Sequence, residues 1–212
     1  MVGLLSLAVL AALLRAREGG APHVAILAAF LLAGVKDEGA AHVIAVAAAV
    51  AVTTGERRAP ALAAAAALVS AGTWRVLLAL AGVEHGDHAL EGAGLVDAPA
   101  IATEVVRGAT DVLSWGATWP LALAASVVCV RRGDPRARAV VLALALSFAA
   151  LLTGVLAGSE RVRAFALDGT LMNRLLMQLL PLAAWLVLEG IAIARDPRPT
   201  TAGGAPRVSA PG

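Results

Sequence analysis

Apolar runs broken by short charged segments constrain this chain more than any other feature of its sequence. The clearest case is Lys36-Asp37-Glu38-Gly39, which lies between HVAILAAFLLAGV and AAHVIAVAAAVAVTTG. Three consecutive charged residues are costly in hydrocarbon, so they mark either a tight turn at a membrane surface or a polar site there. Such a chain is expected to fold as membrane-spanning helices joined by short polar turns.

The composition supports a membrane protein and argues against a nucleic-acid partner. Hydrophobic residues make up 59% of the 212 and charged residues 15%, whereas soluble domains carry about 25% charged residues. The net charge of +2 comes without a basic stripe interleaved with aromatics, which a nucleic-acid-binding protein would show. The single cysteine, Cys129, excludes an intramolecular disulfide and a multi-cysteine metal site.

The fold class predicted is all-α, a polytopic transmembrane helix bundle with about seven spans. The apolar runs cover residues 1–14, 22–35, 40–54, 60 to about 70, 115–132, 139–157 and 171–194. The first three runs are short for a bilayer that needs about 20 residues, so tilted or partly shielded helices are expected and the count could be six.

The basic residues predict the orientation, because arginine and lysine gather in cytoplasmic loops. With the N-terminus outside, the cytoplasmic side receives Arg15, Arg17, Arg57, Arg58, Arg131, Arg132, Arg136, Arg138, Arg195 and Arg198. The outside receives Lys36, Arg75, Arg107, Arg161 and Arg163. This orientation predicts a multi-pass protein of the cell membrane, and the basic residues on the outside need a separate explanation.

One long polar segment, residues 83–114, interrupts the apolar pattern. It is predicted to be an external loop carrying a surface-lying amphipathic helix, because apolar residues recur at helical spacing between Pro99 and Leu113. The residues of that apolar face are Ile101, Val105, Val106 and Val112. Residues 1–198 are then one transmembrane helical domain, and the Pro/Gly-rich tail 199–212 is expected to be disordered.

The Lys36–Glu38 pair has two interpretations. The plain one is a helix–helix turn whose Lys36 and Glu38 side chains pair or extend to water. The sharper one is a cation at the outer membrane surface that binds a lipid-linked phosphate, with lysine acting as a point charge.

A second polar group begins at Arg75 and continues into the loop. Glu84, His85 and Asp87 fall within EHGDH, and His and carboxylates at short spacing can suit zinc or manganese. However, the glycine within this stretch breaks helical geometry and no further ligand pair is evident. A divalent metal is therefore possible but not indicated, and a solvated loop is expected.

A third polar group opens the last span. Arg174 and Gln178 are four residues apart and share one helix face, next to Asn173. Facing lipid would be costly, so they are expected to face a cavity or other helices, or Arg174 to extend to the external surface. Pro181 is expected to kink this helix, while His42 is expected to be a packed or interfacial histidine.

Two stretches resemble integral-membrane glycosyltransferases of the GT-C type, which use polyprenyl-phosphate sugars. AGVKDEGAAHVIAVAAAV is similar to their helix break of the form xKxEG, and DGTLMNRLLMQLLPLAAWL resembles their closing helix. Between these, TWRVLLALAGVEHGDHAL is similar to the aromatic-Arg segment that enters their large external loop. The resemblance covers most of residues 20–195 and corresponds to the C-terminal half of such an enzyme.

The resemblance implies a hexosyltransferase half that binds a polyprenyl-phosphate sugar through Lys36, Arg75 and Arg174. The supporting polar residues would be Glu38, Glu84, His85, Asp87, Asn173 and Gln178. The chain departs from the family because the first external loop with its catalytic acid is absent, so the catalytic residues are unknown. The expected account is a C-terminal fragment of such an enzyme, or a split subunit that is inactive alone and whose catalytic N-terminal half is another chain. The alternative is a non-enzymatic membrane scaffold or assembly subunit.

Overall fold

The computed structural model of the chain describes residues 1–35, 37–83 and 97–195. Within these ranges the secondary structure is all helical, as predicted. The helices are α1 (Val2–Arg17), α2 (His23–Val35), α3 (Asp37–Thr54), α4 (Arg58–Leu80), α5 (Ala98–Thr110), α6 (Val112–Trp115), α7 (Thr118–Arg132), α8 (Pro135–Ala157), α9 (Glu160–Leu167) and α10 (Thr170–Arg195).

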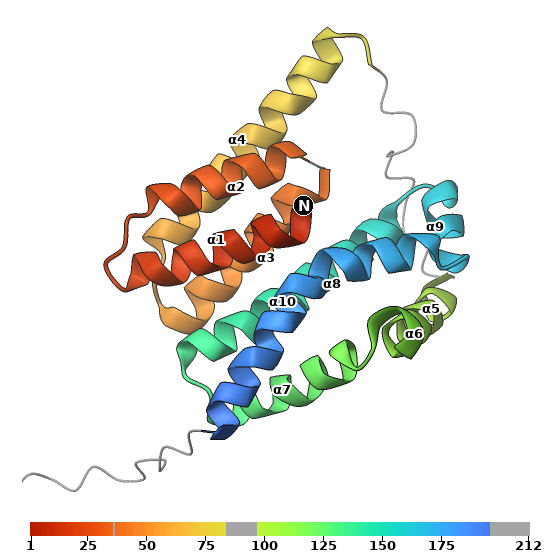
Figure 1. Cartoon of the computed structure of the whole chain (residues 1–212). Coiled ribbons are helices and arrows are strands. Elements are labelled where there is room, and N and C mark those ends of the chain that lie inside the picture. The colour runs from red at the N-terminus through yellow and green to blue at the C-terminus, as the bar shows by residue number, and fades with distance from the viewer. Residues whose placement is uncertain (36, 84–96, 196–212) are drawn as a thin grey trace, which may run out of the picture.

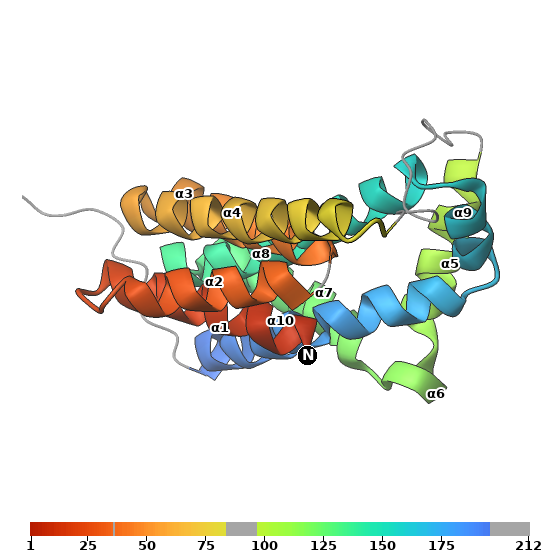
Figure 2. The same cartoon turned by 90° about the horizontal axis from the view of Figure 1, so that it is seen from above.

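The longer helices form one bundle in which α1, α2, α3, α4, α7, α8 and α10 lie side by side (Figures 1 and 2). The main packing partners are α3 with α8, α2 with α4, and α7 with α10. Leucines fill the middle of the bundle, and small residues at the contacts let the backbones approach closely. The buried leucines of this core include Leu10, Leu13, Leu32, Leu182 and Leu186.

Three described helices are long and apolar enough to cross a membrane, namely α4, α8 and α10, with 23, 23 and 26 residues. Helices α2 and α3 are apolar but shorter. Helices α1 and α7 contain 16 and 15 residues. The short early runs predicted from the sequence are therefore short helices.

The charged turns lie mainly at one end of the bundle. The α1–α2, α3–α4 and α7–α8 turns and the end of α10 lie at one end of it (Figure 1). These are the segments that hold the arginines assigned to the cytoplasm, apart from Arg198, which lies outside the described residues. Helices α5, α6 and α9 lie at the opposite end, together with the start of α10 (Figures 1 and 2). The bundle thus has one arginine-rich end and one end covered by short helices.

The predicted amphipathic helix of the 83–114 segment corresponds to α5, but its apolar face differs from the prediction. Ile101 is fully buried and Val105 is half-buried, whereas Val106 is 61% exposed. Helix α5 packs against α9 and α10, and only one stripe of a helix can face that contact. Of the four apolar residues noted at helical spacing, Ile101 and Val105 therefore face this contact and Val106 does not, and the side chain of Val112 lies outside the described residues.

Two segments contain more helix than the sequence pattern predicts. Helix α4 continues past Trp74 and Arg75, and the chain turns only at Gly82, whose φ of +66° favours glycine. The segment from Ser159 to Thr170, which lies between two of the apolar runs, contains α9, and Ser159 caps this helix by accepting a hydrogen bond from the Val162 N–H.

Candidate functional site

A groove of about 720 Å³ lies toward the end of the bundle opposite the arginine-rich turns. Its wall is built from the end of α2, the start of α3, the ends of α4 and α8, part of α9 and the start of α10. Segments more than 100 residues apart in sequence therefore meet around one space. The groove is the candidate functional site.

Three arginines line this groove, and each comes from a different helix. They are Arg75 of α4, Arg161 of α9 and Arg174 of α10. Arg75 and Arg174 are exposed, and neither makes an ion pair with a residue that the structure describes. Arg161 lies over the ring of Phe165, with 5.7 Å between the guanidinium carbon and the ring centroid. Cations that converge from three helices make the groove suitable for an anion.

Apolar side chains complete much of the groove wall. Trp74 of α4 and Phe165 of α9 line it, and so do the buried side chains of Leu151, Val155 and Leu175. A charged ligand without an apolar part would leave this surface uncovered. The combination of arginines with aliphatic and aromatic walls suits an amphiphilic anion.

The groove wall also contains uncharged and acidic polar groups. Glu38 of α3 and Gln178 of α10 both line it. His42, one turn after Glu38, is 1% exposed and close enough to Gln178 and Glu38 to interact with them. The prediction of a packed His42 is confirmed.

Four of the residues singled out from the sequence line the same groove: Glu38, Arg75, Arg174 and Gln178. The shared face of Arg174 and Gln178 follows from their spacing, as predicted. Asn173 is exposed and does not line the groove; its amide oxygen instead lies toward Gly108 of α5. The structure thus does not bring Asn173 together with the other two in the groove, because one step along a helix turns a side chain by about 100°.

The remaining predicted site residues lie outside the described residues. These are Lys36, Glu84, His85 and Asp87. The described residues contain no group of three His, Cys, Asp or Glu side chains that could hold a metal ion, and EHGDH is not among those residues.

Arg161 is the groove residue that the sequence pattern does not single out. In the sequence it is only one of the basic residues assigned to the outside, which need a separate explanation. In the structure Arg163 pairs with Asp97 at 3.1 Å and Arg107 pairs with Glu104, and Arg161 lines the groove. The sequence feature that could have identified Arg161 is that it is an arginine on the external side of an apolar chain.

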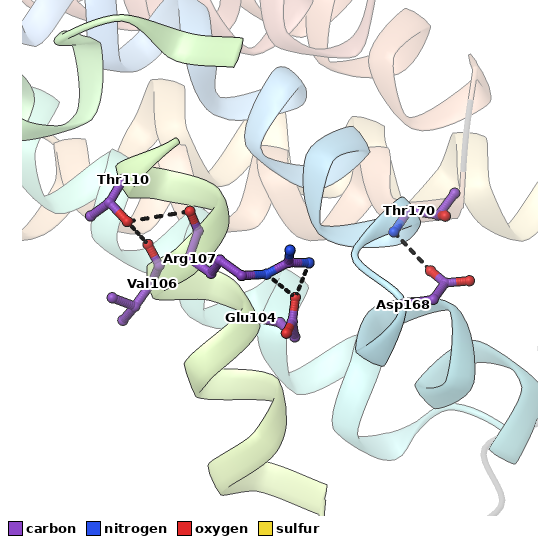
Figure 3. A network of polar contacts seen from close by, with 6 residues as sticks. All are labelled: Glu104, Val106, Arg107, Thr110, Asp168 and Thr170. Atoms are coloured by element: carbon purple, nitrogen blue, oxygen red, sulfur yellow. Dashed lines mark hydrogen bonds and ion pairs between the residues drawn. The ribbon is translucent and has the colours of Figure 1, made fainter. Parts of the chain in front are cut away.

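The start of α10 is fixed by local polar contacts next to the groove (Figure 3). Asp168 accepts a hydrogen bond from the Thr170 N–H at 2.8 Å, which caps the helix that carries Arg174. On α5, Arg107 donates to Glu104 at 2.8 Å and lies beside the α9–α10 turn. Asp168 thus caps the first turn of α10, and the ion pair of α5 lies beside that turn.

No protein-family model, no curated protein and no solved structure matches the chain. The likeness to GT-C glycosyltransferases therefore rests only on the short stretches quoted above.

Proposed function

We propose that the chain is a multi-pass membrane protein whose groove binds a lipid-linked phosphate. In this arrangement α1, α2, α3, α4, α7, α8 and α10 cross the membrane with the arginine-rich end in the cytoplasm. The outward faces of the bundle support this, because large apolar side chains are exposed along several helices. Examples are Leu62, Leu68 and Val69 on α4 and Leu121, Leu123 and Val127 on α7.

The observation that carries the proposal is the convergence of Arg75, Arg161 and Arg174 on one groove. Arginine is suited to phosphate because its planar guanidinium offers several donors to phosphate oxygens. Each of the three arginines lines the groove in which such a phosphate would bind. Since the same groove has apolar walls, the favoured ligand carries a hydrocarbon chain as well as the phosphate.

The resemblance narrows this ligand to a polyprenyl phosphate that carries a sugar. In a transfer reaction the arginines would bind and stabilise the phosphate as the leaving group. The general base that accepts the acceptor's proton is not assigned on this chain. We therefore propose that the chain provides the donor side of a hexosyl transfer and that a separate half provides the catalytic acid.

The direct test is a titration of the purified chain with a polyprenyl phosphate, followed by thermal unfolding. Wild type is expected to show a saturable rise in melting temperature, because a ligand that binds only the folded state stabilises it. Arg75→Ala and Arg174→Ala are each expected to weaken binding about ten-fold, as for the loss of a charge-assisted hydrogen bond. Gly154→Leu should also weaken binding, because Gly154 lines the groove and its Cβ would point into open space.

Arg195→Ala is the matched control, because Arg195 is an exposed arginine at the other end of the same helix. It should bind like wild type. If the wild-type chain shows no saturable stabilisation, or if Arg195→Ala loses as much affinity as Arg174→Ala, the groove is not a phosphate site.

The alternative function is that of an assembly subunit, and the exposure of the C-terminal end of α4 favours it. From Gly72 to Val83 every side chain is exposed except Leu78, which is half-buried. An apolar helix end that few of the described residues cover can serve as a contact for another membrane helix. Cysteine crosslinking at Leu80 in native membranes tests this: crosslinks to another protein would support the assembly role.

A further inference from the structure

The C-terminal ends of α7 and α10 lie next to each other at the arginine-rich end of the bundle (Figure 1). The two helices approach closely where Gly190 meets Ala125, because a Cβ on Gly190 would lie only 2.6 Å from the Ala125 Cβ. Beyond this contact α7 ends in Arg131 and Arg132, and α10 ends in Arg195. At the rise of an α-helix, each arginine lies about 8–11 Å beyond the contact along its own helix.

These three residues, the terminal arginines, have no described partner for their charge. Arg131, Arg132 and Arg195 are exposed, and none of them makes an ion pair with a residue that the structure describes. Guanidinium groups offer several hydrogen-bond donors and keep their charge at any physiological pH. The terminal arginines are therefore available to an anion from outside the chain.

The carboxylates of the same segments make other contacts. Asp134, in the α7–α8 turn, caps α8 by accepting a hydrogen bond from the Ala137 N–H at 3.0 Å. Glu189 of α10 accepts a hydrogen bond from Trp185 and pairs with Arg136 of α8. Because neither carboxylate pairs with a terminal arginine, this part of the surface keeps an excess of positive charge.

The excess is larger here than at the other charged turns of the same end. The described residues of the α7–α8 turn and of the last turns of α10 include five arginines and two carboxylates, a net charge of +3. The α1–α2 turn and the α3–α4 turn each contain two arginines and one glutamate, a net charge of +1. An anion is therefore attracted most strongly to the ends of α7 and α10.

Exposed apolar side chains precede the terminal arginines on both helices. They are Val127 and Val130 on α7 and Leu188 and Ile191 on α10. An acidic segment of a soluble protein would leave these side chains in water. A phospholipid supplies both an anionic headgroup for the arginines and acyl chains for the apolar surface. The arrangement therefore favours a lipid as the anion.

We infer that Arg131, Arg132 and Arg195 bind the headgroup phosphate of an anionic phospholipid in the cytoplasmic leaflet. The inference rests on the orientation given in the proposed function, which puts these arginines at the cytoplasmic surface, and not on the ligand of the groove. The phospholipid would lie at the end of the bundle opposite the groove and contact α7 and α10 together.

The test measures which phospholipid the purified chain retains. The protein in an uncharged detergent is titrated with phosphatidylglycerol or with phosphatidylcholine of the same acyl chains, and bound lipids are counted by native mass spectrometry. Wild type is expected to bind the first phosphatidylglycerol at least about ten-fold more tightly, because each arginine near an anionic surface contributes about five-fold. Inorganic phosphate should not displace it, and displacement at equal concentration would show that the site is not a lipid site.

A triple variant removes the terminal arginines, with the changes Arg131→Gln, Arg132→Gln and Arg195→Gln. It should bind the two phospholipids within about two-fold of each other. Because these side chains are exposed and make no described ion pair, its melting temperature in phosphatidylcholine nanodiscs should stay close to that of wild type. The matched control is the double variant Arg57→Gln/Arg58→Gln, which removes exposed arginines of the α3–α4 turn and should keep the preference for phosphatidylglycerol.

A groove variant, Arg75→Gln/Arg174→Gln, separates the two lipid sites and should also keep the preference. If the groove variant loses the preference and the triple variant keeps it, the phospholipid lies in the groove and the inference is overturned, although the groove still binds a lipid phosphate. Absence of a preference in wild type, or an equal loss in the Arg57→Gln/Arg58→Gln control, also overturns the inference. The proposed function fails by a different result, namely the absence of saturable stabilisation by polyprenyl phosphate.

Discussion

Gly39 of α3 lies against the carbonyl oxygen of Leu32 in α2, so close that a Cβ on residue 39 would overlap that oxygen. The polar segment between the two apolar runs thus ends in Gly39, because any side chain at this position would clash with the backbone of α2. The glycine lets the first turn of α3 fold back against the last turn of α2. It also places Glu38, the neighbouring residue, in the groove wall.

Gly39→Ala is expected to destabilise the protein by about 1–3 kcal/mol, the usual range for forcing extra atoms into a packed site. The overlap is with backbone, which cannot rotate away as a side chain could. Thermal unfolding of the variant and wild type in the same lipid environment measures the difference.

Gly154→Ala provides the matched control for that substitution. Gly154 is also helical, but a Cβ there would meet no atom within 4 Å. Because alanine is a better helix former than glycine, this variant should be neutral or more stable by up to about 1 kcal/mol. Equal losses in both variants would mean that the close approach at Gly39 is not what limits stability.

At the arginine-rich end, Glu189 links α8 to α10. Its Oε1 accepts a hydrogen bond from Trp185 Nε1 at 2.9 Å and lies 3.4 Å from Arg136 Nε. Arg136 also lies over the Trp185 ring. Glu189→Leu is expected to lower stability by about 1 kcal/mol by removing the shared acceptor. Arg138→Ala, an exposed neighbour, should change it by less than about 0.5 kcal/mol, and a similar loss in both would argue against the link.

Arg163 ties α9 to the start of α5 across 66 residues of sequence. It donates to Asp97 at 3.1 Å and to the carbonyl oxygen of Gly158. Arg163→Ala and Asp97→Ala are each expected to cost about 1 kcal/mol, because the pair is only partly exposed. A double-mutant cycle checks this, since the two losses should not add if the side chains act together. Full additivity would show that they do not interact.

The pKa of Asp111 is expected to respond to Ser114. The hydrogen bond from the Ser114 hydroxyl holds the pKa of this carboxyl below its ordinary value of 3.8, with a further contribution from the Leu113 N–H. A lowered pKa in the folded state means that the carboxylate stabilises the fold above pH 3.8. That contribution is lost as the pH falls through the lowered pKa.

Ser114→Ala should therefore raise the pKa of Asp111 toward its ordinary value, which NMR titration of the labelled carboxyl carbon can measure. Thr110→Ala is the control, because the hydroxyl of Thr110 donates to backbone carbonyls of α5 and not to Asp111. An unchanged pKa in Ser114→Ala would mean that this hydrogen bond does not form in solution.

Much of the fold could be predicted from the sequence because the apolar runs are bounded by local signals. The run 22–35 corresponds to α2 and the run 171–194 to α10, with ends displaced by one residue. The differences arise where those signals are weak. The Trp74-Arg75 pair resembles the end of a span, although the nearest glycine with a left-handed backbone is Gly82. The cap of α9 is a single serine, Ser159, which is a common residue in loops as well.

The candidate site could be predicted only in part, because proximity between distant helices is set by packing. The spacing of Arg174 and Gln178 is enough to give them a shared helix face. No local pattern predicts that Arg161 lies in the same groove. The buried state of His42 was expected, but its closeness to Gln178 depends on how α3 and α10 meet in the bundle.

The central claim is that a lipid phosphate lies between α4, α9 and α10, and photo-crosslinking tests it most directly. A polyprenyl phosphate with a photoreactive group next to the phosphate is irradiated with the protein in nanodiscs, and labelled peptides are mapped by mass spectrometry. Labels are predicted near Arg75, Arg161 and Arg174, and an excess of unlabelled polyprenyl phosphate should suppress them. Labels spread over the outward faces of α4 and α7, unaffected by the competitor, would contradict the claim.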